Sequence, residues 1–320
     1  MTMTTTPTTT AEPSGATRRL PVVIIIACLL VAGGVLLAAV REFGQEWQHG
    51  ADYSGGPMPA IHAAAQAGDA AGISRELARG VAVDLSLDAG ETWSIGMTPL
   101  MLASMNAKPE AVRTLLQAGA TSNARSRNGH TALILAAAWA DAPTVQALVD
   151  KGALMDARTE DGWTALTLGA ARGKAECVTA LINAGADVNG RNKWGQTPLH
   201  LACQSGDADK VEAVLRAGPD VNIGDSTSGE TPLLAAVRSG GSTEIVTMLL
   251  EARAQVDKAD NDGVTPLMVA ADRADQQKVT ALLAAGASRT ATDAAGRTAA
   301  QWAEARGDDL GGQVAEMLRP

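Results

Sequence analysis

The stretch Gly195-Gln196-Thr197-Pro198-Leu199-His200-Leu201-Ala202 is the clearest copy of a phrase that recurs along most of the chain. Its Gly-x-Thr core appears seven times at steps of 33 or 34 residues, with threonine at positions 98, 131, 164, 197, 231, 265 and 298. A period this regular is typical of a stacked repeat protein, in which each unit packs only against its neighbours. The sequence therefore predicts a solenoid.

One unit, residues 195–228, shows what each repeat contains. Thr197 and Pro198 open a first helix, because threonine is a favoured N-cap and proline suits the first helical position. A second apolar period begins near Val211 and ends at Gly218, which is placed to adopt the left-handed backbone that closes a helix. A polar, turn-rich loop follows, which we call a finger. Two short helices with one shared apolar face cannot stand alone, so the units must stack.

Thr-Pro-Leu-His with Leu-Ala-x-x-x-Gly, followed by Val-x-x-Leu-Leu-x-x-Gly-Ala-Asp-Val-Asn, resembles the ankyrin repeat. The match covers residues 59–320 and comprises about eight units. The resemblance implies an all-α solenoid of helix–turn–helix repeats with hairpin-like fingers. It also implies protein binding, without catalysis, on a concave surface made by the fingers and the exposed side of the first helices.

Departures from the pattern lead to local expectations. Arg253 stands where the other units have the helix-ending glycine, so we expect it to adopt a left-handed backbone at some cost. The first finger, residues 84–96, is longer than the others and contains Trp93. His62 and His200 occupy one framework position, where the ring is expected to bond the neighbouring turn.

Composition argues against several classes of function. The net charge of −9 and the lack of a long basic stripe are a poor match to a phosphate backbone, so no nucleic-acid partner is expected. The cysteines Cys28, Cys177 and Cys203 form no Cys-x-x-Cys pair, and the last two are predicted to be small buried thiols. No catalytic motif is present, so we expect neither an enzyme nor a cofactor, a metal or a small-molecule substrate.

Residues 20–40 run for 21 residues without a charge and end at Arg41. A helix that spans a bilayer needs about 20 apolar residues, so we predict a single uncleaved transmembrane helix. A cleaved signal peptide is one alternative, although its apolar core is normally shorter. A lipoprotein signal at Cys28 is another, although twelve more apolar residues follow it. Residues 1–19 are predicted to be a disordered tail and residues 41–58 a polar juxtamembrane linker.

Charge beside the predicted span suggests its orientation. Arg18 and Arg19 precede it, whereas Arg41 alone follows it, next to Glu42. The positive-inside rule then places the N-terminus in the cytoplasm and the repeats outside the cytoplasmic (inner) membrane. Cytoplasmic repeats, or secretion after cleavage, remain the alternatives. The Ala-, Gly- and Arg-rich composition suggests a bacterial source.

A partner surface follows from the resemblance, because ankyrin partners usually contact the finger tips and the exposed ends of the first helices. The matching positions are Arg127, Asn128, His130, Trp139, Asp161, Trp163, Arg172, Lys193, Trp194, Gln196 and Ser205, with Glu160 beside them. The three tryptophans come from adjacent repeats, so we expect them to lie near one another. Exposed tryptophan flanked by arginine is typical of a binding hot spot. The alternative is that each tryptophan packs on the next finger as filler.

The sequence thus predicts a membrane-anchored interaction scaffold that tethers or inhibits an envelope protein, with a protein as its partner. A constitutive structural subunit of a membrane protein complex is the alternative. Co-purification in fixed stoichiometry would favour the alternative.

Overall fold

The computed structural model describes residues 58–88 and 94–319. These residues form sixteen α-helices in eight pairs and no strand, with one isolated bridge between Thr292 and Thr298. The predicted all-α class and the repeated helix pairs are confirmed. The predicted tail, the predicted membrane span and the linker up to residue 57 lie outside the described residues. Among the helices that the structure describes, none is long and apolar enough to cross a membrane.

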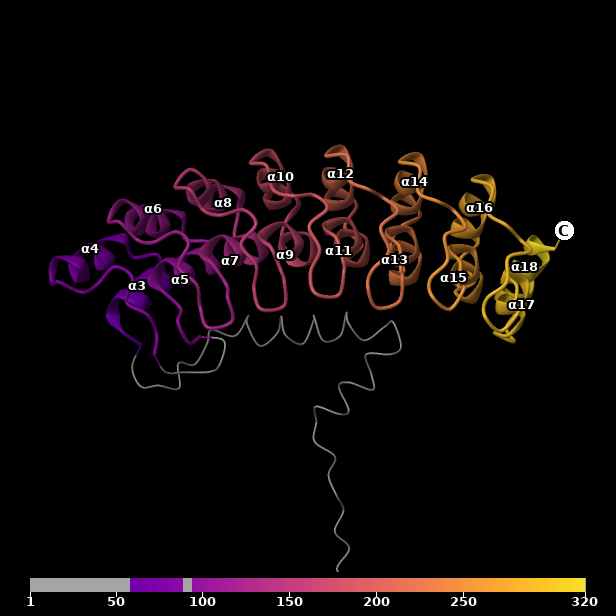
Figure 1. Ribbon diagram of the computed structural model, residues 1–320, viewed down its shortest axis with the longest axis horizontal. Helices are drawn as coiled ribbons and strands as arrows, with labels where there is room; N and C mark the ends of the chain where they lie inside the picture. Colours follow the sequence, from indigo (N-terminus) through magenta and orange to yellow (C-terminus); the bar gives the residue numbers. More distant parts are fainter. Residues whose placement is uncertain (1–57, 89–93, 320) are drawn as a thin grey trace, which may run out of the picture. The chain divides into compact units, whose positions relative to one another are not determined.

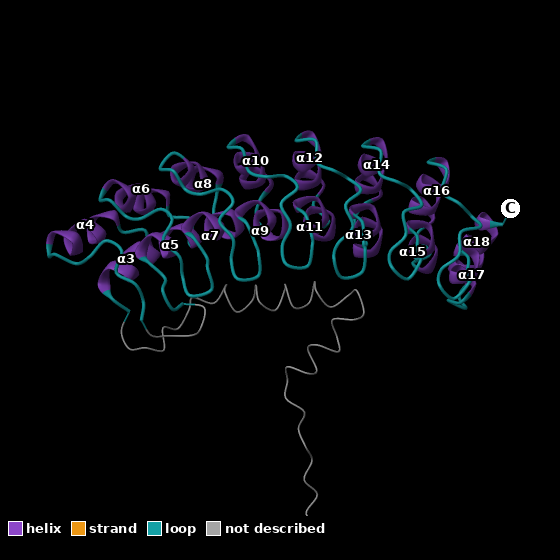
Figure 2. Cartoon of the chain, viewed as in Figure 1, coloured by secondary structure: helices purple, strands orange, loops and turns teal. Residues whose placement is uncertain are grey.

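The first helices of the repeats form one row and carry the fingers at their N-terminal ends. Figure 1 shows this row along the concave edge of the repeat array, and Figure 2 shows the loops that hang from it. The row consists of α3 (Ala60–Ala67), α5 (Pro99–Met105), α7 (Ala132–Trp139), α9 (Ala165–Arg172), α11 (Pro198–Ser205), α13 (Pro232–Ser239), α15 (Pro266–Asp272) and α17 (Ala299–Glu304).

The second helices form the other row, along the convex edge (Figure 1). They are α4 (Ala70–Ala78), α6 (Pro109–Gln117), α8 (Ala142–Val149), α10 (Ala175–Asn183), α12 (Ala208–Arg216), α14 (Thr243–Glu251), α16 (Gln276–Ala284) and α18 (Asp309–Leu318). They are more amphipathic than the first helices. In α12, for example, Val211 and Val214 are buried, whereas Glu212 and Arg216 face solvent.

The recurrent threonine caps the first helices, as the sequence predicts. The side-chain oxygen of Thr197 accepts a hydrogen bond from the backbone N–H of His200, three residues on. The same bond is made by Thr98, Thr131, Thr164, Thr231, Thr265 and Thr298. It satisfies one of the backbone N–H groups that a helix N-terminus leaves without a partner.

The first helices supply most of the core. Every residue of α7 before Trp139 is buried, because α5 and α9 cover it on two sides and α8 on a third. The buried residues are mainly leucine and alanine, whose small average size lets neighbouring repeats approach closely. Cys177 and Cys203 are fully buried, as predicted, and burial raises the pKa of the Cys177 thiol to about 11. They are packing residues.

Histidine joins one repeat to the next. The ring of His200 is completely buried, and burial lowers its pKa to about 4, so the ring is neutral at pH 7. A neutral imidazole donates through one nitrogen and accepts through the other. Nε2 lies 2.8 Å from the carbonyl oxygen of Glu230 in the next repeat, and Nδ1 accepts from Thr197. His62 repeats the contact, with Nε2 3.2 Å from the carbonyl oxygen of Met97. The predicted framework role of both histidines is confirmed.

The residue that closes each second helix from α4 to α16 has a left-handed backbone. Gly218 has a φ of 68°, and a Cβ atom built there would meet nothing within 4 Å. Arg253 holds the equivalent place after α14 with a φ of 66°, as the sequence predicts. A side chain in this conformation costs about 1–2 kcal/mol, because Cβ approaches the following carbonyl oxygen.

We therefore predict that Arg253→Gly stabilises the repeat domain by about 1 kcal/mol. The matched variant is Gly218→Arg, which introduces the same strain at a position with open space and is expected to destabilise the domain by a similar amount. Urea unfolding of the full chain in detergent, followed by circular dichroism, measures both changes. Equal midpoints for wild type and Arg253→Gly would contradict the strain argument.

Candidate functional site

Each finger from residue 121 onward is a turn held by its own backbone and by one polar side chain at its base. In the finger at residues 187–196, the N–H of Asn192 donates to the carbonyl oxygen of Gln196 over 3.1 Å. The buried side chain of Asn192 then accepts from the backbone N–H groups of Trp194 and Gln196. Ser126, Thr159, Asp260 and Asp293 occupy the same place in other fingers and make bonds of the same kind.

Successive fingers are joined to one another through the backbone. The N–H of Lys193 donates to the carbonyl oxygen of Asp161 over 3.0 Å, and the N–H of Ser226 donates to that of Trp194 over 2.8 Å. Equivalent bonds start at Arg127, Glu160, Asn261 and Ala294. The approach is so close that a Cβ atom at Gly195 would lie 2.5 Å from the backbone nitrogen of Ser226. The fingers therefore form one continuous surface with fixed spacing.

Two of the three predicted tryptophans meet on this surface. Trp163 and Trp194 belong to adjacent fingers, and their ring centroids are 5.8 Å apart at an interplanar angle of 59°. The ammonium of Lys193 lies 4.7 Å from the centroid of the Trp194 ring and also pairs with Asp161. Both rings remain partly exposed. Trp139 lies on a different element, at the C-terminal end of α7, and is half-buried.

The finger at residues 121–130 carries three more of the predicted residues. Arg127 is exposed, and Asn128 is half-buried with its carbonyl oxygen accepting from the next finger. His130 is half-buried, and burial lowers its pKa despite the opposing charge of Asp161. The imidazole of His130 is therefore neutral at pH 7.

The remaining predicted residues differ in exposure. Arg172 and Ser205 end α9 and α11, the former half-buried and the latter exposed. In contrast to the expectation of an exposed contact residue, Gln196 is only 3% exposed. Its amide bonds to Asn192 over 3.0 Å and to Gln204 over 3.4 Å. Gln196 therefore supports the surface from beneath, because its amide is already bonded to its own finger and to α11, the helix that follows it.

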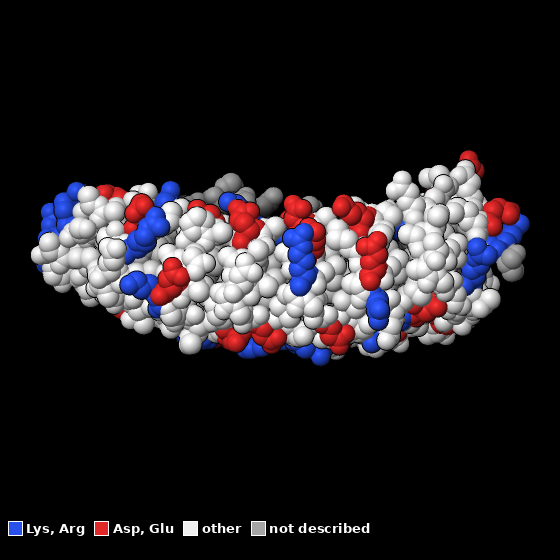
Figure 3. Space-filling view, turned by 90° about the horizontal axis from the view of Figure 1, so that it is seen from above, with Lys and Arg blue, Asp and Glu red and all other residues white. Residues whose placement is uncertain are grey.

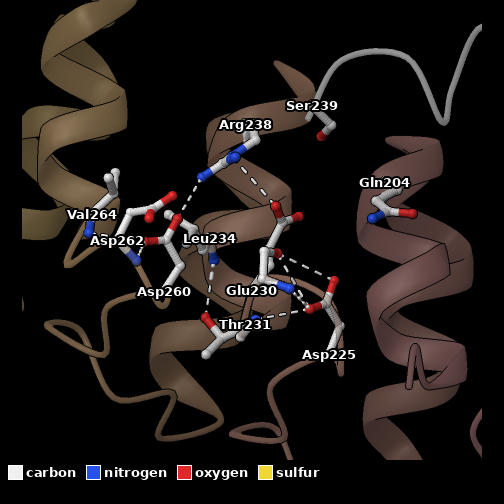
Figure 4. A network of polar contacts seen from close by, with 12 residues as sticks. Gln204, Asp225, Glu230, Thr231, Leu234, Arg238, Ser239, Asp260, Asp262 and Val264 are labelled. Atoms are coloured by element: carbon white, nitrogen blue, oxygen red, sulfur yellow. Dashed lines mark hydrogen bonds and ion pairs between the residues drawn. The ribbon is translucent and has the colours of Figure 1, made fainter. Parts of the chain in front are cut away.

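Gln196 begins a polar chain that the sequence does not reveal. We use "polar chain" for Gln196, Gln204, Glu230, Arg238 and Asp260, which lie on three successive fingers and on the helices α11 and α13. Gln204 bonds to the carboxylate of Glu230. Arg238, on α13, then lies between two carboxylates, with Nε 3.4 Å from Glu230 and Nη2 3.0 Å from Asp260, as Figure 4 shows. No sequence motif marks these positions, because each contact joins a finger residue to a first-helix residue that is 8 to 26 positions away in the sequence.

Burial dominates the electrostatics of the polar chain. The side chains of Glu230 and Asp260 are 10% and 4% exposed, whereas that of Arg238 is 26% exposed. Burial raises the pKa of Glu230, and the charge of Arg238 opposes the rise. Arg238 is therefore the cation that allows two carboxylates to sit side by side beneath the surface.

We predict that Arg238→Met lowers the free energy of unfolding by about 2 kcal/mol at pH 7, because it leaves two buried carboxylates without a cation. Loss of the Arg238 charge also raises the pKa of Glu230 further above the ordinary value of 4.5. The folded state then binds a proton more tightly than the unfolded state. Relative to wild type, the deficit should shrink as the pH falls through the folded pKa towards 4.5. Urea unfolding at pH 7 and pH 5 measures the deficit.

The double variant Arg238→Met/Glu230→Gln is the control for this prediction. It removes one of the two stranded carboxylates and should recover part of the lost stability at pH 7. A deficit of equal size at both pH values, with no recovery in the double variant, would rule out the electrostatic explanation.

Charges of opposite sign are paired along the second helices. On the second helices, cations sit beside acids, as in the 2.6 Å contact between Arg113 and Glu110, and Figure 3 shows the two signs side by side. Among the described residues, no group of three or more His, Cys, Asp or Glu side chains could hold a metal ion. The finger surface carries aromatic and charged side chains that contact one another, namely Trp163, Trp194, Lys193 and Asp161.

Comparison with known proteins agrees with this geometry. A family model described as ankyrin repeats (3 copies) matches residues 61–159, 140–225 and 206–293. A search of curated proteins found no match. The matched segments together span residues 61–293, more than two thirds of the chain, and their repeats coincide with the helix pairs and fingers described above. The chain belongs to the ankyrin-repeat family.

Proposed function

We propose that this protein is a membrane-anchored, non-catalytic scaffold that binds a protein partner through the fingers at residues 121–130, 154–163 and 187–196. Ankyrin repeats generally mediate protein–protein interaction. The proposal adds a location to that general role. Binding would then tether the partner at the membrane or inhibit it.

The observation that carries the proposal is the contact between Trp163 and Trp194. A side chain that only fills space would be buried, whereas both rings here stay partly exposed and come from different fingers. Lys193 lies against one ring and Asp161 holds that lysine in place. Tryptophan is enriched among the residues that contribute most to the binding energy of protein interfaces.

Rigidity supports the same role. The fingers are tied to each other by backbone hydrogen bonds before any partner arrives. Ordering a mobile side chain on binding costs about 0.5–1.5 kcal/mol. A surface that is already ordered avoids much of this cost, so modest contacts give useful affinity.

We predict that Trp163→Ala together with Trp194→Ala abolishes partner capture while leaving the fold intact. A photo-crosslinking amino acid at the exposed position 127, in cells that naturally carry this chain, should give a discrete adduct with one protein. The adduct should disappear in the double variant, because the aromatic contact area is lost. Circular dichroism checks that the helices remain.

Two controls make the capture experiment specific. The crosslinker at position 216 on α12, away from the fingers, should give no such adduct. Leu310→Ala removes a side chain that is 53% exposed on α18 in the last repeat, and it should leave capture unchanged. Undiminished capture by the double tryptophan variant would refute binding through the fingers.

Membrane anchoring is the second part of the proposal, and the sequence supports it. Residues 20–40 are uncharged over a length that can span a bilayer, and Arg18 and Arg19 lie on their N-terminal side. We propose that the repeats lie outside the cytoplasmic membrane.

This topology predicts that protease added to intact spheroplasts digests the repeats. A cytoplasmic protein serves as the control for membrane integrity and should survive the same treatment. Repeats that stay protected until detergent is added would place them in the cytoplasm instead. Release of the repeats into the medium before protease is added would indicate cleavage of the N-terminal segment.

A further inference from the structure

Three arginines form a ladder along the fingers, at positions 125, 158 and 191. Each guanidinium donates to a backbone carbonyl of the next finger: Arg125 to Arg158 over 2.5 Å, Arg158 to Arg191 over 2.6 Å, and Arg191 to Gly224 over 2.7 Å. All three residues are exposed. We call these three residues the arginine ladder.

The ladder keeps its positive charge unneutralised. A carbonyl oxygen is a neutral acceptor, and within the described part of the chain none of the three guanidinium groups pairs with a carboxylate. Each guanidinium has five N–H donors, of which only one or two are used here. The carbonyl contacts hold the groups in position and leave donors facing solvent.

The three finger tips that carry the ladder are basic when the ladder itself is counted, against the trend of the whole chain. The tips at residues 125–130, 158–163 and 191–196 carry five cationic and two acidic side chains, a net charge of +3. The whole chain has a net charge of −9. The next two tips, residues 224–230 and 259–264, carry four acidic side chains and no cation. The tips of these three adjacent fingers are therefore basic, whereas the two that follow are acidic.

The spacing of the ladder points to the shape of a ligand. Successive repeats stack through helices that pack about 8–10 Å apart, and the arginines are 33 residues apart, one per repeat. A polyproline II segment advances about 9 Å in three residues and returns to the same face. Carboxylates three residues apart on such a segment would meet successive guanidinium groups, and arginine is well suited to bind carboxylates through paired donors.

The tryptophan pair lies on the fingers of two ladder residues. Trp163 follows Arg158 and Trp194 follows Arg191 within the same fingers, and both rings are partly exposed. Aromatic-lined surfaces are one of the recurring ways in which proteins hold polyproline II segments.

We propose that the arginine ladder and the tryptophan pair bind an extended acidic polypeptide segment with carboxylates three residues apart. This inference rests on the proposed function and adds the chemistry of the partner. The guanidinium groups of the ladder bind the carboxylates, and the rings of the tryptophan pair contact the residues between them.

Binding of defined peptides to the full chain in non-ionic detergent tests this proposal by fluorescence anisotropy. The probe is a labelled twelve-residue peptide with the repeat Glu-Pro-Ser, compared with the same peptide carrying Gln or Lys in place of Glu. Wild type should bind the Glu peptide at least tenfold more tightly than either, and added salt should weaken the binding. A peptide of equal composition with its four glutamates consecutive should bind more weakly.

A matched pair of triple variants separates the ladder from net charge. Arg125→Gln/Arg158→Gln/Arg191→Gln should weaken Glu-peptide binding about tenfold or more, given two- to fivefold per exposed ion pair. Arg75→Gln/Arg113→Gln/Arg216→Gln makes the same charge change on the second helices and should alter binding less than twofold. If the ladder variant unfolds by circular dichroism, Arg158→Gln and Arg113→Gln replace the two triples, with a two- to fivefold loss expected only for the former.

Several results would overturn the proposal. Equal losses in the two triple variants would reduce the effect to net charge. Tighter binding of a twelve-nucleotide oligothymidylate than of the Glu peptide would indicate a nucleic acid, and self-association lost in the ladder variant without peptide binding would indicate a second copy of the chain. The proposed function fails separately: if the double tryptophan variant still captures its natural partner, capture through the tryptophan pair is wrong even where the Glu peptide binds the ladder.

Discussion

The backbone hydrogen bond from each finger to the next is the interaction on which the exposed surface depends. It fixes the distance between the residues at equivalent positions in neighbouring repeats, such as Arg158 and Arg191. The bond is possible because the finger glycine has no Cβ to separate the chains. Residues that recur every 33 positions in the sequence therefore form a regularly spaced row of side chains on the surface.

The parts of the fold that sequence predicts best are those governed by neighbours in the chain. The Thr197 cap, the left-handed Arg253 and the bond from His200 to the next repeat all follow from local pattern. The burial of Gln196 does not, because it depends on Gln204 two turns further along and on the packing of two elements. Arg238 also escapes prediction, since its partners lie on two different fingers.

The arginine ladder is an intermediate case. Its spacing of 33 residues is visible in the sequence, yet arginine in one finger looks like an ordinary solvated side chain. What distinguishes it is the acceptor: Arg125, Arg158 and Arg191 all reach a carbonyl oxygen and not a carboxylate. On the second helices the same residue type is paired with glutamate, as in Arg216 and Glu212. Exposure alone does not separate the two situations, whereas the identity of the acceptor does.

The polar chain from Gln196 to Asp260 has a mechanical consequence. A stack of repeats bends by opening and closing the gaps between neighbouring units, much as a spring does, because each unit contacts only the next. In the segment from α11 to the finger before α15, bending must also stretch the contacts of Arg238 with Glu230 and Asp260. The contacts of Arg238 with Glu230 and Asp260 therefore resist bending in this segment. This segment follows directly after the basic fingers, so we expect the array to bend less on the C-terminal side of those fingers than the repeat packing alone would allow.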